Sequence, residues 1–245
     1  MLDRNGELMR SCGALVLAVL MVCWCSPQSL AAQNSESPQK QGADDAILLG
    51  MSCALSGPME ALGVELYRGS RAYFDQINRN GGVWGRRVKI IIYDDGYEPF
   101  SAVRNTIKLI QEDKVFLLFG YVGTPTITKV LPLLRAFKND HIYVFAPFTG
   151  ARPQRIPPYS DYVVNIRASY EDETAGLVNY FLSKGYRRIG FLGQADAYGK
   201  SGEEGVKKAL AAHRLDITGA VTYPRNIPFS SDMSEQVKIL RDLGS

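Results

Sequence analysis

Five turns of the sequence combine small residues with hydroxyl or carboxylate side chains, and each follows a short apolar run. They span residues 54–58, 94–96, 120–125, 147–151 and 194–199. Where such a turn starts a helix, its N–H and O–H groups can donate hydrogen bonds to an anion, typically a carboxylate or a phosphate. One such turn alone is typical of an ordinary capped helix, but several at one edge of a sheet favour a ligand site.

No motif in the sequence indicates catalysis. The first apolar run is not followed by G-x-G-x-x-G, and neither G-x-x-x-x-G-K-[ST] nor G-x-S-x-G occurs, which weakens dinucleotide, NTPase and hydrolase interpretations. His141 and His213 belong to no motif, and no cluster has the spacing of metal ligands. Asp94 and Asp95 are the one obvious carboxylate pair, but neighbouring strand-end residues point in opposite directions, so the better explanation is that one of them caps a loop. We expect no enzymatic activity, no cofactor and no metal.

The strands that must position the five turns can be predicted from hydrophobic patterning. Short runs rich in Ile, Val, Leu, Phe and Tyr predict strands at residues 47–49, 88–93, 115–119, 142–145, 162–166, 188–192 and 217–223. Uninterrupted apolar runs of this length are typical of strands that are covered on both faces, as in a parallel sheet.

Amphipathic segments lie between these runs. Helical spacing of apolar residues at 103–110 and 127–134 predicts two helices, and further helices are predicted at residues 63–79, 170–183, 200–213 and 231–243. Pro132 predicts a kink or an early end of its helix. Alternating strands and helices predict a doubly wound α/β fold with parallel sheets flanked by helices, whose ligands bind beyond the carboxyl ends of the strands.

The N-terminal segment has the pattern of a secretory signal. Arg4 and Arg10 precede a 14-residue apolar run at 12–25, and small residues follow at 29–32. The run is shorter than the roughly 20 residues that a membrane-spanning helix needs, so we predict a signal peptide over residues 1–31 rather than a transmembrane anchor. The residues before the cysteines of the run fit a lipoprotein signal poorly. Residues 32–45 are predicted to be a polar linker.

Composition narrows the class of protein further. The chain has 245 residues, of which 46% are hydrophobic and 22% charged, with a net charge of +3, so collagen, a disordered acidic chain and a polytopic membrane protein are excluded. The small, evenly spread charge gives no reason to expect a nucleic-acid partner. Once the signal is removed, Cys53 is the only cysteine left, and it is predicted to be a small buried residue at the end of a strand.

The motifs of residues 46–245 resemble one family throughout. The run Ser52–Pro58, the Asn78-x-x-Gly81-Gly82 segment and Tyr93-Asp94-Asp95 followed by Glu98-Pro99 are very similar to the opening of type I periplasmic solute-binding proteins. The branch they resemble most is the leucine/isoleucine/valine-binding type that serves ABC importers. The likeness continues through 120–124, 146–151 and 196–199.

This resemblance implies two Rossmann-like lobes that close over a ligand. Residues 46–166 would form most of lobe I and residues 167–245 the first part of an incomplete lobe II, so the chain is expected to be a fragment of a longer protein. The ligand-binding residues that the resemblance implies are Gly123, Thr124, Thr149, Gly150, Ala151 and, from the second lobe, Tyr198. Branched-chain amino acids, other amino acids, aromatic acids and dicarboxylic acids all remain open as ligands.

The resemblance also implies a function. It identifies the chain as an extracytoplasmic or periplasmic solute-binding subunit, a monomer that delivers an amino acid or related small carboxylate to the membrane subunits of an ABC permease. The alternative is the extracellular ligand-sensing domain of a receptor with the same fold. A transmembrane helix encoded downstream would favour the receptor, and neighbouring permease genes would favour transport.

Overall fold

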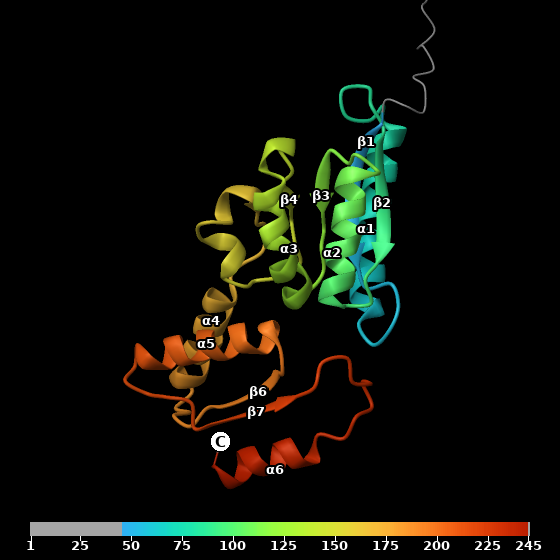
Figure 1. The fold of residues 1–245 in the computed structure, drawn as a ribbon. Helices are drawn as coiled ribbons and strands as arrows, with labels where there is room; N and C mark the ends of the chain where they lie inside the picture. Colours follow the sequence, from blue (N-terminus) through green and yellow to red (C-terminus); the bar gives the residue numbers. More distant parts are fainter. Residues whose placement is uncertain (1–45, 245) are drawn as a thin grey trace, which may run out of the picture. The chain divides into compact units, whose positions relative to one another are not determined.

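The computed structural model describes residues 46–244, and the predicted signal peptide and linker lie outside them. Strands and helices alternate along the chain, as the sequence predicts (Figure 1). The strands are β1 (Ile47–Cys53), β2 (Val88–Asp94), β3 (Leu117–Phe119), β4 (Val144–Phe145), β5 (Val163–Val164), β6 (Gly190–Gln194) and β7 (Gly219–Tyr223). The α-helices are α1 (Glu60–Arg79), α2 (Pro99–Gln111), α3 (Thr124–Ala136), α4 (Tyr170–Ser183), α5 (Ala197–Ala211) and α6 (Ser234–Asp242). Single turns of 3₁₀ helix are η2 (Lys138–Asp140), η3 (Pro153–Arg155) and η4 (Ser160–Tyr162).

The strands form two parallel sheets. Five of them make a sheet in the order β2-β1-β3-β4-β5, and β6 pairs with β7 in a second sheet. The parallel α/β fold predicted from the apolar runs is therefore confirmed. We call the five-stranded sheet with α1, α2 and α3 layer A, and the two-stranded sheet with α4, α5 and α6 layer B.

Both faces of the layer A sheet are covered, which explains why its strands are largely apolar. Met51 and Cys53 of β1 pack on the face that α1 covers, in a cluster with Leu66. The opposite face carries α2 and α3, whose Leu109 and Leu131 belong to the largest cluster of buried residues (Figure 1). Side chains of a strand alternate between faces, so one short strand supplies both cores.

Layer B has a smaller core. Helices α4 and α5 lie side by side (Figure 1), and Val178, Leu182 and Leu210 form their buried cluster. Helix α4 begins as predicted, because the side chain of Ser169 accepts a hydrogen bond from the backbone N–H of Asp172.

Pro132 does not end its helix. Helix α3 continues to Ala136, so the predicted early end is wrong. A proline inside a helix removes one backbone hydrogen bond, but Leu131 and Leu134 on either side are completely buried. The burial of these two side chains outweighs the lost hydrogen bond.

Candidate ligand-binding cleft

A cavity of about 350 Å³ lies where the carboxyl ends of the strands meet. Every strand contributes residues to the lining, at its end or in the segment that follows it, and α4 contributes its first residue. The lining residues are Met59 and Leu62 after β1, Tyr97 after β2, Val122, Gly123 and Thr124 after β3, Phe148 after β4, Arg167 after β5, Tyr170 at the start of α4, Gln194 at the end of β6, Tyr198 after β6, and Tyr223 at the end of β7. We call this cavity the cleft. It occupies the edge of the sheets at which doubly wound folds bind their ligands, and its volume is at the small end of ligand pockets.

The structure divides the six residues expected to bind the ligand into two groups. Gly123, Thr124 and Tyr198 line the cleft. Thr149, Gly150 and Ala151 are buried behind it and are not among its lining residues.

The buried group supports the lining group through hydroxyl hydrogen bonds. Thr124 Oγ1 lies 2.7 Å from Thr149 Oγ1 and 3.3 Å from the Tyr170 hydroxyl. Thr149 Oγ1 also accepts a hydrogen bond of 3.2 Å from the backbone N–H of Ala151. Three mutually bonded hydroxyls can use all their protons among themselves, so this cluster fixes the start of α3 beside the cleft.

Helix α3 presents its positive end to the cleft. Thr124 is its first residue and Gly123 its N-cap. The first N–H groups of a helix have no partner within the helix, and they carry the positive end of its dipole. An anion in the cleft would be stabilised there.

Arg167 adds a guanidinium group to this part of the cleft, and its charge is paired with that of Glu173. Its Nε and Nη2 donate hydrogen bonds of 3.0 and 3.1 Å to the two carboxylate oxygens of Glu173. Its guanidinium also lies over the rings of Phe148, at 5.0 Å, and Tyr170, at 5.2 Å. These contacts hold the guanidinium in one orientation and leave N–H donors unused, because arginine has five.

Tyrosines form much of the remaining wall. The rings of Tyr170 and Tyr198 meet edge to face, with centroids 5.4 Å apart. Burial raises the pKa of Tyr97 well above its ordinary value, and the negative charge of Asp196 raises it further. Burial also raises the pKa of Tyr198. Both phenols are therefore neutral at physiological pH.

The two adjacent carboxylates after β2 have separate structural roles. Asp94 accepts hydrogen bonds from the backbone N–H of Leu55 and the hydroxyl of Ser56, at 2.8 and 2.6 Å, so it is the one of the two that caps a loop, as the sequence predicts for one of them. Asp95 is buried and accepts from Ser52 Oγ at 2.8 Å and from the N–H of Tyr97 at 2.9 Å. Burial raises the pKa of Asp95 to about 6.

One ion pair joins the two layers beside the cleft. Arg225, which follows β7, donates to Glu98, which precedes α2, with Nη2 at 3.1 and 2.9 Å from the two carboxylate oxygens. Asn226 Nδ2 donates a further hydrogen bond of 3.0 Å to the same carboxylate. These contacts connect segments that are 127 and 128 residues apart.

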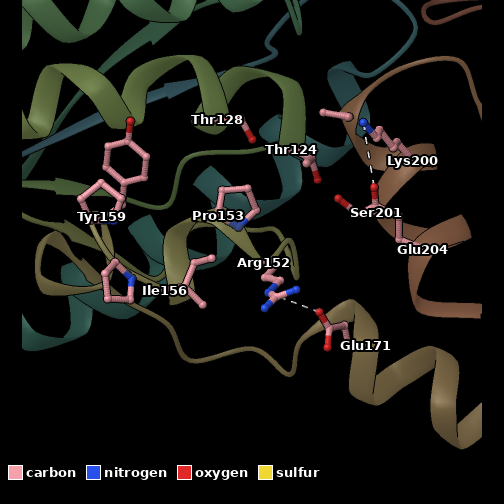
Figure 2. Close-up of a pocket in the computed structure, with 13 residues that line it drawn as sticks. Thr124, Thr128, Arg152, Pro153, Ile156, Tyr159, Glu171, Lys200, Ser201 and Glu204 are labelled. Carbon is pink, nitrogen blue, oxygen red and sulfur yellow. Dashed lines mark ion pairs between the residues drawn. The ribbon is translucent and has the colours of Figure 1, made fainter. Parts of the chain in front are cut away.

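A second cavity, of about 470 Å³, shares Thr124 with the cleft (Figure 2). Its charged side chains are largely paired with one another. Figure 2 shows the ion pairs Arg152–Glu171 and Lys200–Glu204, whose closest atoms are 3.7 and 3.9 Å apart. Of the six expected ligand-binding residues, only Thr124 lines this cavity.

Sequence reasoning missed several lining residues of the cleft. They are Tyr97, Phe148, Arg167, Tyr170, Gln194 and Tyr223. Arg167 could have been found, because it directly follows the predicted strand 162–166, where the carboxyl-end rule applies. Residues 46–244 contain no group of three His, Cys, Asp or Glu side chains that could hold a metal ion. Within the same range, no helix is both long and apolar enough to cross a bilayer.

Comparison with known proteins consistently finds periplasmic binding proteins. The profile of the family described as periplasmic binding protein matches residues 46–244. The Leu/Ile/Val-binding protein BraC3 of Rhizobium johnstonii is 24% identical over 168 residues, which are 68% of this chain and 44% of that protein.

Solved structures agree in fold. A possible leucine/isoleucine/valine-binding protein from Rhodopirellula baltica superimposes with a TM-score of 0.70 and 34% identity, over 77% of this chain and 51% of that one. An ABC-transporter solute-binding protein from R. palustris in complex with benzoate has a TM-score of 0.70 at 22% identity, over 81% and 53% of the two chains. The chain thus spans about half the length of the relatives it matches.

Proposed function

Because the chain belongs to the periplasmic binding protein family, we propose that it is an extracytoplasmic solute-binding subunit of an ABC importer. In this proposal the cleft binds a small carboxylate between layers A and B, and the protein delivers it to the membrane subunits of the permease. The observation that carries the proposal is the position of Arg167 and the start of α3 on the same cavity.

Two features support a carboxylate as the bound group. Planar guanidinium groups match carboxylates with paired hydrogen bonds, and Glu173 holds Arg167 in place for such a contact. The backbone N–H of Thr124 adds an N-terminal donor of α3, whereas the N–H of Gly123 already donates to the carbonyl of Phe148 and Pro125 has no N–H. Thr149, Gly150 and Ala151 then act by positioning Thr124, and Tyr198 covers the ligand from layer B.

Relatives are consistent with this class of ligand. One is named a Leu/Ile/Val-binding protein, and one solved structure contains benzoate. Both kinds of compound carry a carboxylate, so the proposal does not depend on which side group is recognised.

The carboxylate requirement can be tested with pairs of compounds that differ only in that group. We expect calorimetry on the purified protein to detect binding of at least one carboxylate from a panel of amino acids, aromatic acids and dicarboxylic acids. The matching amide, such as leucinamide or benzamide, should bind at least tenfold more weakly, since it cannot form charge-assisted hydrogen bonds with Arg167. Equal binding of acid and amide, or no binding by any acid, would contradict the proposal.

Delivery to a permease requires a test in cells. Deletion of the gene should abolish high-affinity uptake of the compound identified by calorimetry. If uptake continues and only a cellular response to that compound is lost, the protein is the sensing domain of a receptor instead.

A further inference from the structure

Aromatic side chains are concentrated in the cleft. Of the twelve described residues that line it, five are aromatic, namely Tyr97, Phe148, Tyr170, Tyr198 and Tyr223, although aromatic residues make up only 10% of the chain. They come from the ends of β2, β4, β6 and β7 and from the start of α4. Rings contributed by so many elements surround the space where a ligand would lie.

These rings differ in how much of their surface the protein covers. Tyr97 and Tyr170 are almost fully buried, whereas Phe148 is 41% and Tyr198 43% exposed. The first pair therefore forms a fixed wall, and the second pair keeps ring surface that a ligand can cover. Large exposed apolar surface in a concave site is typical of a place where an apolar part of a ligand binds.

Arg167 supplies a carboxylate contact beside these rings. Two of its five N–H groups donate to Glu173, which leaves three that can donate elsewhere. The guanidinium lies over Phe148 and Tyr170, so an acid bound to Arg167 would have its side group next to aromatic rings.

The carboxylates near the cleft already have protein partners. Asp196 accepts hydrogen bonds from the backbone N–H groups of Tyr198 and Gly199 and from Gln194 Nε2. Glu98 accepts from Arg225 and Asn226. Among the described lining residues none is Asp or Glu. Among residues 46–244, an α-ammonium group in the cleft would therefore have to share carboxylates that already accept three hydrogen bonds each.

We infer, on the premise of the proposed function, that the ligand is an aromatic monocarboxylate. Its carboxylate would bind Arg167 and the start of α3, and its ring would pack against Phe148, Tyr198 and Tyr97. Aromatic rings prefer edge-to-face and offset contacts with one another, and Tyr170 and Tyr198 already make such a contact at this site.

Benzoate and cyclohexanecarboxylate are a matched pair of probes for this inference. They share the carboxylate and the six-membered ring, but only benzoate has a π face. We expect calorimetry on the purified protein to give roughly tenfold tighter binding of benzoate than of cyclohexanecarboxylate, because two or more ring contacts favour the flat aromatic ring. Leucine should bind more weakly than benzoate.

Variants then test which residues carry the preference. Phe148→Leu and Tyr198→Leu should each reduce the ratio of benzoate to cyclohexanecarboxylate affinity severalfold, while Tyr198→Phe, which keeps the ring, should preserve it. Arg167→Lys should weaken both acids by about tenfold or more, because lysine lacks the planar fork. Arg152→Lys is the matched control, because it makes the same substitution at the second cavity. It should leave the affinities for benzoate and cyclohexanecarboxylate within about twofold of the wild type. Circular dichroism and thermal unfolding show whether each variant is folded.

The outcomes separate this inference from the proposed function. Tighter binding of leucine, or equal binding of benzoate and cyclohexanecarboxylate, overturns the aromatic ligand and leaves a carboxylate-binding protein. Binding that is lost in Arg152→Lys and retained in Arg167→Lys overturns the placement in the cleft. Absence of binding by every acid overturns both the inference and the proposed function.

Discussion

The ring of Tyr97 occupies the space that a side chain on Gly123 would fill. A Cβ atom placed on Gly123 would lie 2.3 Å from Cε2 of Tyr97, and Gly123 has a φ of +104°. Both residues line the cleft. The loop after β2 can thus pack against the loop after β3 only because residue 123 is a glycine.

Gly123→Ala should displace Tyr97 and destabilise the protein. We expect a loss of about 2–4 kcal/mol in the free energy of unfolding, measured by chemical denaturation, from backbone strain together with the steric clash. Gly57→Ala is the matched control, because Gly57 has a φ of +77° but no atom near its Cβ position. It should show the strain alone. Equal losses in the two variants would mean that the contact with Tyr97 has no energetic role.

Asp95 should make stability depend on pH. Its pKa is raised from 3.8 to about 6 by burial, so the folded state binds a proton more tightly than the unfolded state. The group therefore lowers stability as pH rises from about 4 to about 6, by up to about 3 kcal/mol, since a tenfold change in proton affinity is worth about 1.4 kcal/mol. Asp95→Asn should gain stability relative to the wild type over this interval, as measured by denaturation at several pH values.

Asp94→Asn is the control for Asp95→Asn, because the neighbouring carboxyl group has the opposite shift. Burial raises the pKa of Asp94 but the hydrogen bonds from Ser56, Leu55 and Gly96 lower it below its ordinary value. Its stabilising contribution is present at neutral pH and is lost as the pH falls. The deficit of Asp94→Asn should therefore shrink on acidification. The same pH dependence in both variants would contradict the two assignments.

The Glu98–Arg225 ion pair should slow release of the ligand. It joins layer A to layer B beside the cleft, and its side chains are partly exposed, so it contributes at most about 1 kcal/mol. Arg225→Met should increase the dissociation rate by up to about fivefold, measured by stopped-flow fluorescence, with less effect at high salt. Glu203→Gln removes an ion pair within α5 and should leave the rate unchanged. An unchanged rate in Arg225→Met would show that the pair does not hold the layers together.

Cys53 should be an unreactive thiol in the folded protein. It is completely buried, and burial raises the pKa of its thiol to about 12, with Asp95 and Asp94 adding to the effect. Only the thiolate reacts with thiol reagents. Peptide mass spectrometry should find Cys53 unlabelled under native conditions and labelled in denaturant. Rapid native labelling would show that β1 opens locally.

The fold could be predicted from sequence because its main signal is local. Alternating apolar runs and amphipathic segments specify a parallel sheet covered on both faces. The ends of the strands could not be predicted as well, because burial does not require strand pairing. Ile142 is buried, yet β4 comprises only Val144 and Phe145.

The cleft was predictable only as a set of strand ends. Gly123 and Thr124 were found because they follow a strand, but the setting of Arg167 depends on contacts with Phe148 and Glu173. The direction in which a buried hydroxyl points cannot be predicted from the sequence either. Thr149 was expected to face the ligand, whereas its side chain contacts Thr124 and Tyr170.

Thr149→Val should therefore affect stability more than ligand binding. Valine has nearly the same shape, so it creates no cavity, but it leaves the buried N–H of Ala151 without the acceptor that Thr149 Oγ1 provides. An unsatisfied buried donor costs about 1–3 kcal/mol, which chemical denaturation can measure. Thr174→Val is the control, since the Thr174 hydroxyl only donates back to its own helix, and it should cost much less. Thr124→Val breaks the same hydroxyl cluster at the start of α3, so it should also lose stability, and it should in addition weaken carboxylate binding by about tenfold. If Thr149→Val weakens binding as strongly as Thr124→Val and leaves stability unchanged, its hydroxyl contacts the ligand directly.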